Sequence, residues 1–373
     1  MKIAKLTVKL AALLVAASFS FSVAQSTWDG GDDLPTSPLP CGNEAAPAPA
    51  AQPYDGGSAS GAAISEGDSL SFVDVPKLVG IGYFNATTQG IQEAAEELGN
   101  MTGRTDGPTE ANIDDQIAVI ENYISSGSIQ GILFAANDPV AISPVLKRAL
   151  EEGIHVVGYD ANSQPDAREW FVNQAEFNGI AKAMIDSMVA EKGDAAQFGI
   201  VTSTFTTPNQ ARWIAEMQAY QESCFPDMAW LETLEAQEDA VQSFNQANTL
   251  INKYGDDLDG IFGMTSVATP SSADAVTQAG LCGEVAVVGL ATPNDMKPYV
   301  ESDCVKSVVL WNPVDLGYAA AYTLRAAAEG TLTADSTTVS AGRLGDLQII
   351  NGSEILLGAP FIFTSENIND FDF

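Results

Sequence analysis

Short apolar runs alternate with longer amphipathic segments from Leu70 almost to the end of the chain. Strand-length apolar runs bounded by turn residues predict buried strands, and longer segments with helical spacing predict helices. The predicted strands are residues 70–75, 131–135, 154–159, 198–202, 260–264, 285–290 and 305–310. The predicted helices are residues 89–98, 113–125, 142–152, 178–191, 210–223, 241–254, 271–279 and 314–329. This alternation predicts an α/β fold built on parallel sheets with helices on both faces.

The number of strand–helix units exceeds what one sheet holds comfortably, and a new series starts near Phe198. We therefore expect two doubly wound parallel-sheet lobes joined by a multi-strand hinge, a geometry that can close on a ligand. Lobe 1 is predicted to comprise residues 69–173 and 313–345. Lobe 2 is predicted to comprise residues 174–312 and 346–373.

Polar residues follow the ends of two lobe 1 strands, and ligands bind outside the carboxyl ends of strands in open α/β sheets. Lys77 follows the first strand and carries three donors for ligand oxygens. Asp160 follows the strand 154–159, and its carboxylate can accept hydrogen bonds from two adjacent hydroxyls of a sugar. The alternatives are a solvated lysine and an aspartate that caps a turn.

The strands 285–290 and 305–310 are separated by a helix-length segment, which predicts a parallel pair with a crossover. The second strand ends in Trp311-Asn312-Pro313. An indole can cover the C–H faces of a polyhydroxylated ligand, and an amide both donates and accepts. The alternative is that Trp311 is only a core aromatic. We expect this tripeptide to be both a cleft wall and a crossing between lobes.

Amides also precede the predicted helix 210–223, in Asn209 and Gln210. An amide-rich crevice suits a neutral polyol, although Asn209 is also a good helix N-cap. Gly80 and Gly82 give only a weak dinucleotide pattern, because Asn85 stands where the third glycine belongs. We therefore expect no cofactor.

Residues that could form a catalytic or metal centre are scarce. His155 is the only histidine and lies in an apolar strand, and the chain has no Gly-x-Ser-x-Gly elbow and no Cys-x-x-Cys pair. We expect neither an enzyme nor a metal site.

Residues 1–24 have the pattern of a secretory signal: three lysines, a short apolar run, and a small-x-small cleavage site ending at Ala24. Residues 25–68 are rich in Pro, Ala, Gly and Ser, which predicts a disordered tether. The apolar run is too short to span a membrane. We expect a periplasmic or secreted protein that is soluble after cleavage.

The formal net charge is −33, and so few basic residues argue against a nucleic-acid partner. We interpret the acids as a solvated surface. Four cysteines in an exported chain permit disulfides. Cys282 and Cys304 each precede one of the last two lobe 2 strands, so they are the favoured pair. Whether Cys41 and Cys224 pair stays open.

Several segments together resemble the periplasmic sugar-binding proteins of ABC importers, in the type I class of ribose- and galactose-binding proteins. Within that class the chain is most similar to the rhamnose-binding and autoinducer-2-binding branch. The matching segments are VPKLVGIGYF (75–84), DGPTE (106–110), LKRAL (146–150), VGLATPNDMKPYV (288–300), VVLWNPVDLG (308–317) and FTSENINDFDF (363–373). The resemblance implies two α/β lobes with a ligand held between them.

The resemblance also implies a ligand set. Lys77 and Asp160 match the lysine and aspartate of autoinducer-2 binders, and Trp311 matches the family's late aromatic. Asn209-Gln210 falls at an Asp-Gln pair, with the aspartate replaced. Met264-Thr265-Ser266 falls at a Pro-x-Ala segment, with both ends replaced. These departures favour a neutral sugar such as rhamnose, a related deoxyhexose or a pentose.

We therefore expect a monomeric substrate-binding protein that closes over one neutral monosaccharide and delivers it to a membrane permease. Lys77, Asp160, Asn209, Gln210 and Asn312 would bind hydroxyls, and Trp311 and Phe84 would stack on the ring. The alternatives are an autoinducer-2 binder and an exported carbohydrate-active α/β enzyme.

Overall fold

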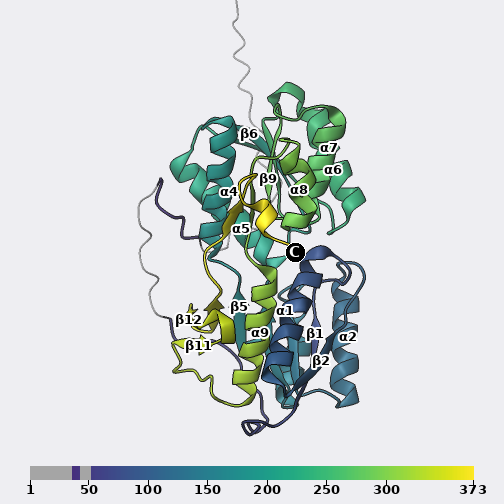
Figure 1. The fold of residues 1–373 in the computed structure, drawn as a ribbon, viewed down its shortest axis with the longest axis vertical. Helices are drawn as coiled ribbons and strands as arrows, with labels where there is room; N and C mark the ends of the chain where they lie inside the picture. The colour runs from purple at the N-terminus through teal and green to yellow at the C-terminus, as the bar shows by residue number, and fades with distance from the viewer. Residues whose placement is uncertain (1–35, 43–51) are drawn as a thin grey trace, which may run out of the picture.

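The computed structural model describes residues 36–42 and 52–373, and the expected signal peptide lies outside these residues. The chain forms two α/β lobes stacked along the long axis of the molecule, with the C-terminus near their junction (Figure 1). The predicted fold class is confirmed. Among the described helices, none is long and apolar enough to cross a membrane.

Lobe 1 is built on an eight-stranded sheet with the order β11-β12-β13-β5-β4-β3-β1-β2. Its first five strands run parallel: β1 (Leu70–Val75), β2 (Met101–Thr105), β3 (Gly131–Phe134), β4 (His155–Tyr159) and β5 (Trp170–Asn173). Late in the chain, three short strands extend this sheet beyond β5: β11 (Thr338–Ser340), β12 (Asp346–Ile350) and β13 (Glu354–Leu356). The carboxyl ends of β1, β3 and β4 therefore meet at one edge, toward lobe 2.

Lobe 2 contains a parallel four-stranded sheet with the order β7-β6-β8-β9. Its strands are β6 (Gln197–Thr202), β7 (Ala229–Glu235), β8 (Gly260–Gly263) and β9 (Ala286–Gly289). β10 (Val308–Leu310) touches the end of β9 through a parallel bridge from Val309 to Leu290, and pairs antiparallel with β14 (Phe361–Phe363). β8 and β9 are buried along their whole length, as continuous apolar runs in parallel sheets require.

Helices cover both sheets. Those of lobe 1 are α1 (Gly82–Leu98), α2 (Ile113–Ser126), α3 (Ser143–Glu151) and α9 (Pro313–Ala328). Those of lobe 2 are α4 (Phe177–Lys192), α5 (Pro208–Cys224), α6 (Ala240–Tyr254), α7 (Ala268–Ala279) and α8 (Pro293–Glu301). α1 and α9 lie side by side (Figure 1) and approach closely at two glycines. A Cβ on Gly90 would lie 1.8 Å from the Val314 carbonyl oxygen, and one on Gly317 would lie 2.0 Å from that of Thr87.

The chain passes between the lobes after β5, after β10 and after β13. The second passage runs through Trp311-Asn312-Pro313, since β10 belongs with lobe 2 and α9 packs on α1, β4 and β5. The expected boundary between residues 345 and 346 is wrong, because β12 and β13 join the lobe 1 sheet and Ile355 pairs with Val172 of β5. These strands are short, and they join the sheet only through the pairing of β13 with β5, far earlier in the chain, so their local pattern did not reveal them.

The expectation of a disordered tether over residues 25–68 is wrong for residues 52–68, which lie along lobe 1. The Tyr54 ring lies 5.0 Å from that of Trp170, and its hydroxyl donates to the Glu169 carbonyl oxygen at 3.0 Å. Backbone N–H groups of Gly57 and Ile64 donate to carbonyl oxygens of lobe 1. The segment has too few apolar residues for a core of its own, but its backbone is satisfied by a surface that is already folded.

Residues 36–42 are attached to lobe 2, again in contrast to the expected tether. Cys41 forms a disulfide with Cys224 at the end of α5. The Ser37 N–H donates to the Glu216 carboxylate at 3.0 Å, and the Asn178 side-chain amide donates to the Ser37 carbonyl oxygen at 2.8 Å. The N-terminal segment therefore has one docked part on each lobe.

The four cysteines form two disulfides, the predicted pair Cys282–Cys304 and the pair Cys41–Cys224, which the sequence left open. The bonded residues are separated by 183 and 22 positions, respectively. A disulfide that closes a longer loop removes more conformational entropy from the unfolded chain.

We expect the double substitution Cys41→Ser/Cys224→Ser to lower the free energy of unfolding by about 2 kcal/mol more than Cys282→Ser/Cys304→Ser, which serves as the matched control. Urea denaturation of the three proteins at equal concentration measures this difference. An equal or smaller loss for the Cys41–Cys224 variant would contradict the entropic account.

Candidate functional site

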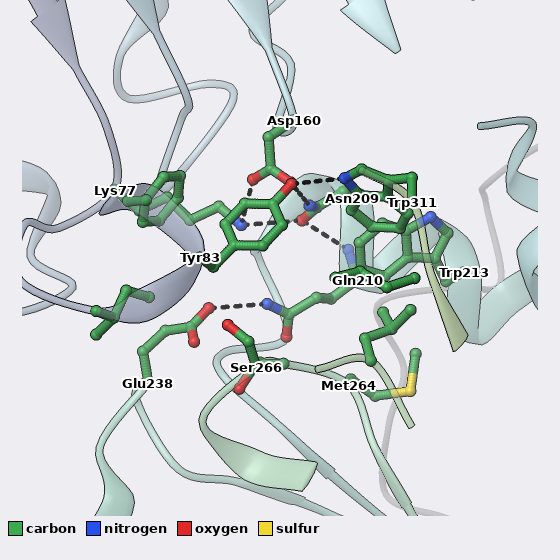
Figure 2. A pocket seen from close by; sticks show the side chains of 15 residues that line it. Lys77, Tyr83, Asp160, Asn209, Gln210, Trp213, Glu238, Met264, Ser266 and Trp311 are labelled. Carbon is green, nitrogen blue, oxygen red and sulfur yellow. Dashed lines mark hydrogen bonds and ion pairs between the residues drawn. The ribbon is translucent and has the colours of Figure 1, made fainter. Parts of the chain in front are cut away.

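A cavity lies between the lobes at the carboxyl ends of the strands of both sheets (Figure 2). Lobe 1 contributes Lys77, Ile81, Tyr83, Phe84 and Asp160. Lobe 2 contributes Asn209, Gln210, Trp213, Glu238, Met264, Thr265, Ser266, Leu290, Leu310 and Trp311. The enclosed space that a water-sized sphere can enter is about 30 Å³, close to the volume of one water molecule. The side chains therefore nearly fill the cavity, and a small ligand would have to displace some of the contacts that they make with one another.

The polar centre of the cavity is a group of three buried side chains that joins the two lobes. The Lys77 Nζ lies 3.1 Å from Asp160 Oδ2, which makes a buried ion pair within lobe 1. Asn209 of lobe 2 accepts from the Lys77 Nζ at 3.3 Å and donates to Asp160 Oδ1 at 3.2 Å. All three residues are less than 5% exposed. The structure is therefore closed around these groups.

The backbone holds Asp160 in a conformation that aspartate adopts less often than glycine. Asp160 follows β4 directly and has φ of 59°, in the left-handed region. Such positions persist where surrounding contacts fix them, and they cluster at functional sites. The turn aims the carboxylate at Lys77 rather than along the strand.

Aromatic side chains form the next layer. The Tyr83 hydroxyl donates to Asp160 Oδ1 at 3.0 Å and accepts from the Trp311 Nε1 at 2.9 Å. The Trp311 ring lies 5.7 Å from that of Trp213. Burial and the nearby Asp160 raise the pKa of Tyr83 well above its usual value, so the phenol stays neutral and acts as a donor.

On the lobe 2 side, Gln210 is occupied at both ends of its amide. Its Oε1 accepts from the Thr202 hydroxyl at 2.5 Å and from the Ser203 N–H at 2.8 Å. Its Nε2 donates to Glu238 Oε1 at 3.1 Å. Burial raises the pKa of Glu238, and the positive charge of Lys77 partly opposes this shift. Gln210 therefore acts mainly to position Glu238.

A family model described as a periplasmic binding protein domain matches residues 72–332 of the chain. This span starts within β1 and ends before β11, and it includes β2–β10 and every residue that lines the cavity. The chain belongs to the periplasmic binding protein family. The resemblance seen in the sequence is thereby confirmed.

Relatives of this periplasmic binding protein include sugar-binding proteins. The D-allose-binding periplasmic protein of Escherichia coli (strain K12) is 25% identical over 239 residues, 61% of this chain and 75% of that protein. A solute-binding protein of an ABC transporter from Clostridium phytofermentas, solved with bound L-rhamnose, is 28% identical with a TM-score of 0.77. The match covers 81% of this chain and 98% of that one.

LsrB from Clostridium saccharobutylicum, solved in complex with AI-2, shares the fold with a TM-score of 0.76 at 23% identity. That match covers 82% of this chain and 100% of the other. Periplasmic binding proteins are non-enzymatic components of transport, so family membership confirms that this chain is not an enzyme. Among the described residues, no group of three or more His, Cys, Asp or Glu is arranged to hold a metal ion.

Most of the residues singled out in the sequence of this binding protein line the cavity. They are Lys77, Phe84, Asp160, Asn209, Gln210, Met264, Ser266 and Trp311. The expectation that Asn312 faces the cavity and binds ligand hydroxyls is wrong. Its side chain accepts from the N–H groups of Val314 and Asp315, at 2.9 and 3.3 Å, and caps α9 instead of facing the cavity.

Sequence reasoning missed seven lining residues: Ile81, Tyr83, Trp213, Glu238, Thr265, Leu290 and Leu310. Trp213 could have been found, because it lies four positions after Asn209 on α5 and so shares its helical face. Glu238 could not, because it follows β7, a strand that the apolar pattern did not predict. Only the fold brings that strand end to the cavity.

A second buried acid, Asp74, lies outside the cavity and holds one of the strands that lead to it. Asp74 of β1 accepts from the Tyr159 hydroxyl at 2.9 Å and from the Thr105 hydroxyl at 2.8 Å. Tyr159 immediately precedes Asp160, so Asp74 fixes the strand end that carries the cavity-facing carboxylate. Burial raises the pKa of Asp74 from 3.8 to about 7.

This pKa shift makes stability depend on pH. Between about pH 4 and pH 7 the folded protein holds a proton on Asp74 that the unfolded chain has lost, so this stabilisation fades as the pH rises. From pH 5 to pH 8 the free energy of unfolding of the wild-type protein should fall by about 2–3 kcal/mol relative to that of Asp74→Asn. The asparagine keeps an acceptor but does not titrate.

Urea denaturation at both pH values measures this difference, with Asp227→Asn, at an exposed turn, as the control. Parallel pH profiles for the wild type and Asp74→Asn would show that Asp74 is ionised in the folded protein.

Proposed function

We propose that this protein is the substrate-binding protein of an ABC sugar importer. It encloses one neutral monosaccharide, a rhamnose-like deoxyhexose or a pentose, and delivers it to a membrane permease. The observation that carries the proposal is the buried group of Lys77, Asp160 and Asn209, which joins the two lobes inside a cavity walled by indole rings.

The chemistry of this group suits sugar hydroxyls. Asp160 can accept from two adjacent hydroxyls, while Lys77 and Asn209 can donate to ring and hydroxyl oxygens. A ligand that enters the cleft would replace the bonds that these three side chains make with one another. Because those bonds span both lobes, ligand contacts at the same atoms would hold the closed form.

Apolar side chains complete the fit. Trp311, Trp213 and Phe84 are buried around the polar group and can cover the C–H faces of a sugar ring. Met264, Leu290 and Leu310 give the lobe 2 wall an apolar surface. A methyl group, as in a deoxyhexose, would be less costly against this surface than a hydroxymethyl group, whose hydroxyl would lose its hydrogen bonds.

The relatives support a sugar ligand, since one binds D-allose and another was solved with L-rhamnose. The second candidate is AI-2, because a structural neighbour was solved with it. The amide at position 209 and the Met264–Ser266 segment depart from the pattern of autoinducer-2 binders, and they favour the sugar. The proposal also includes export to the periplasm and a monomeric state, which are consistent with the family.

A thermal-shift panel of L-rhamnose, D-allose, D-ribose and AI-2 tests the proposal. A ligand at 100 times its dissociation constant stabilises the native protein by about 2.7 kcal/mol, which raises the melting temperature of a protein of this size by roughly 4 °C. We expect such a shift with at least one neutral sugar. No shift with any of the three sugars would sink the proposal, and a shift with AI-2 alone would establish the second candidate.

We expect Asp160→Asn to weaken binding of the best sugar by about 100-fold or more, because the charged acceptor and its ion pair with Lys77 are lost. Asparagine is chosen because it tolerates the left-handed backbone of this position. Isothermal titration calorimetry measures the change. The control is Asp166→Asn, which removes an exposed aspartate paired with Lys147 on the surface. Unchanged affinity for Asp160→Asn would remove this residue from the site.

A further inference from the structure

Glu238 brings a second carboxyl group to the cavity, from the opposite lobe to Asp160. It lies in the turn between β7 and α6 and lines the same cavity as Lys77 and Asp160. Figure 2 shows its side chain pointing into the cavity toward Gln210, on the far side of Tyr83 from Asp160. The two carboxyl groups therefore approach the cavity from different lobes.

The turn that carries Glu238 is held in an unusual backbone conformation. Gln237 and Glu238 have φ of 54° and 55°, so two consecutive non-glycine residues are left-handed. The turn is fixed on both sides. The Gln237 N–H donates to the Ser203 carbonyl oxygen at 3.0 Å, and Asp239 caps α6 by accepting from the Gln242 N–H at 2.7 Å. Strain of this kind is retained where neighbouring contacts determine it, often at ligand sites.

The Glu238 carboxylate has acceptor capacity that the protein does not use. It accepts from the Gln210 Nε2 at 3.1 Å and from the Thr265 hydroxyl. A carboxylate offers about four acceptor positions. Lys77, the cation nearest to this region of the cavity, forms its ion pair with Asp160 instead. Glu238 is thus positioned by its neighbours but not neutralised by them.

The two amides of lobe 2 have different roles in this arrangement. Asn209 serves the Lys77–Asp160 pair, as described above. Gln210 is fixed by Thr202 and Ser203, and it directs its remaining polar atom to Glu238. Position 209 carries no charge, so the acid on the lobe 2 side of the cavity is Glu238, at the end of a different strand.

We propose that Glu238 is a specificity-determining ligand contact, which accepts hydrogen bonds from two adjacent hydroxyls on the face of the sugar that meets lobe 2. This inference rests on the proposed function. The ligand would then lie between two carboxylates, Asp160 from lobe 1 and Glu238 from lobe 2. Sugars with a hydroxyl pair on each of the two faces are selected, and Gln210 is the positioning residue for the second pair.

The first test is calorimetric titration of Glu238→Gln and Glu238→Ala with L-rhamnose, D-allose and D-ribose. For the sugar that the wild type binds most tightly, we expect about tenfold weaker binding for Gln and a larger loss for Ala, since glutamine keeps only one acceptor. Glu232→Gln, on β7 in a surface ion pair with Lys253, is the matched control and should bind as the wild type does.

A second readout separates ligand contact from a structural role. The 2-deoxy and 3-deoxy analogues of the best ligand each lack one hydroxyl. The analogue that lacks the hydroxyl contacted by Glu238 should bind the wild type more weakly than the parent sugar does. The same removal should change binding to Glu238→Ala by less than twofold. If every analogue loses the same factor in both proteins, Glu238 does not contact the ligand.

The pH profile gives a third readout. A protonated Glu238 loses an acceptor, and burial raises the pKa of this group, so affinity should fall as the pH is lowered, and Glu238→Gln should lack this part of the fall. The other titratable or charged groups facing Glu238 are Lys77 on the loop after β1, Tyr83 on α1 and Asp160 after β4, and all three remain in the variant. Identical profiles for both proteins would overturn the proposal.

The outcomes distinguish the two proposals. If the wild type binds none of the three sugars, the proposed function fails and the role of Glu238 fails with it. If the wild type binds a sugar and both Glu238 variants bind it equally well, only the role of Glu238 is overturned. Urea denaturation shows whether each variant is folded. Glu238→Gln, which preserves side-chain shape, carries the test if Glu238→Ala unfolds.

Discussion

The buried ion pair of Lys77 and Asp160 is the constraint on which the rest of the site depends. A charge removed from water must be paired and hydrogen-bonded, because an isolated one is very costly. Each partner is held at the end of a central lobe 1 strand, and Asp160 has a left-handed backbone that aims it at Lys77. Asn209 then satisfies both partners from the other lobe. The pair is therefore complete only when the lobes are closed.

Three buried or half-buried acids surround the cavity, and their environments give them different roles. Asp160 has a cation at ion-pair distance, which makes it a charged acceptor. Asp74 has two hydroxyl donors and no such cation, so burial dominates and raises its pKa to about 7. Glu238 has an environment between those of Asp160 and Asp74, with an amide donor and a lysine that is more distant than an ion-pair partner. The same functional group thus faces the cavity in an ion pair in one place and positions a strand end in another.

The lobes are connected by more of the chain than the strand–helix pattern suggests. Besides the passages after β5, β10 and β13, the N-terminal segment is bonded to lobe 2 through Cys41–Cys224 and lies on lobe 1 through residues 52–68. The passage after β10 forms part of the cavity, since Trp311 lines it one residue before the cap of α9. Movement of one lobe against the other must therefore involve the cavity wall itself.

The sequence alone determined the α/β class, the two lobes and the residues that directly follow predicted strands. Lys77, Asp160 and Trp311 could be found because the carboxyl ends of parallel strands share one edge, so position in the chain implies position in space. Glu238, Tyr83, the Cys41–Cys224 bond and the addition of β11–β13 to lobe 1 were decided by tertiary structure. Each depends on pairing between segments far apart in sequence, and local hydrophobic periodicity carries no information about which distant segment a strand, a turn or a cysteine will meet.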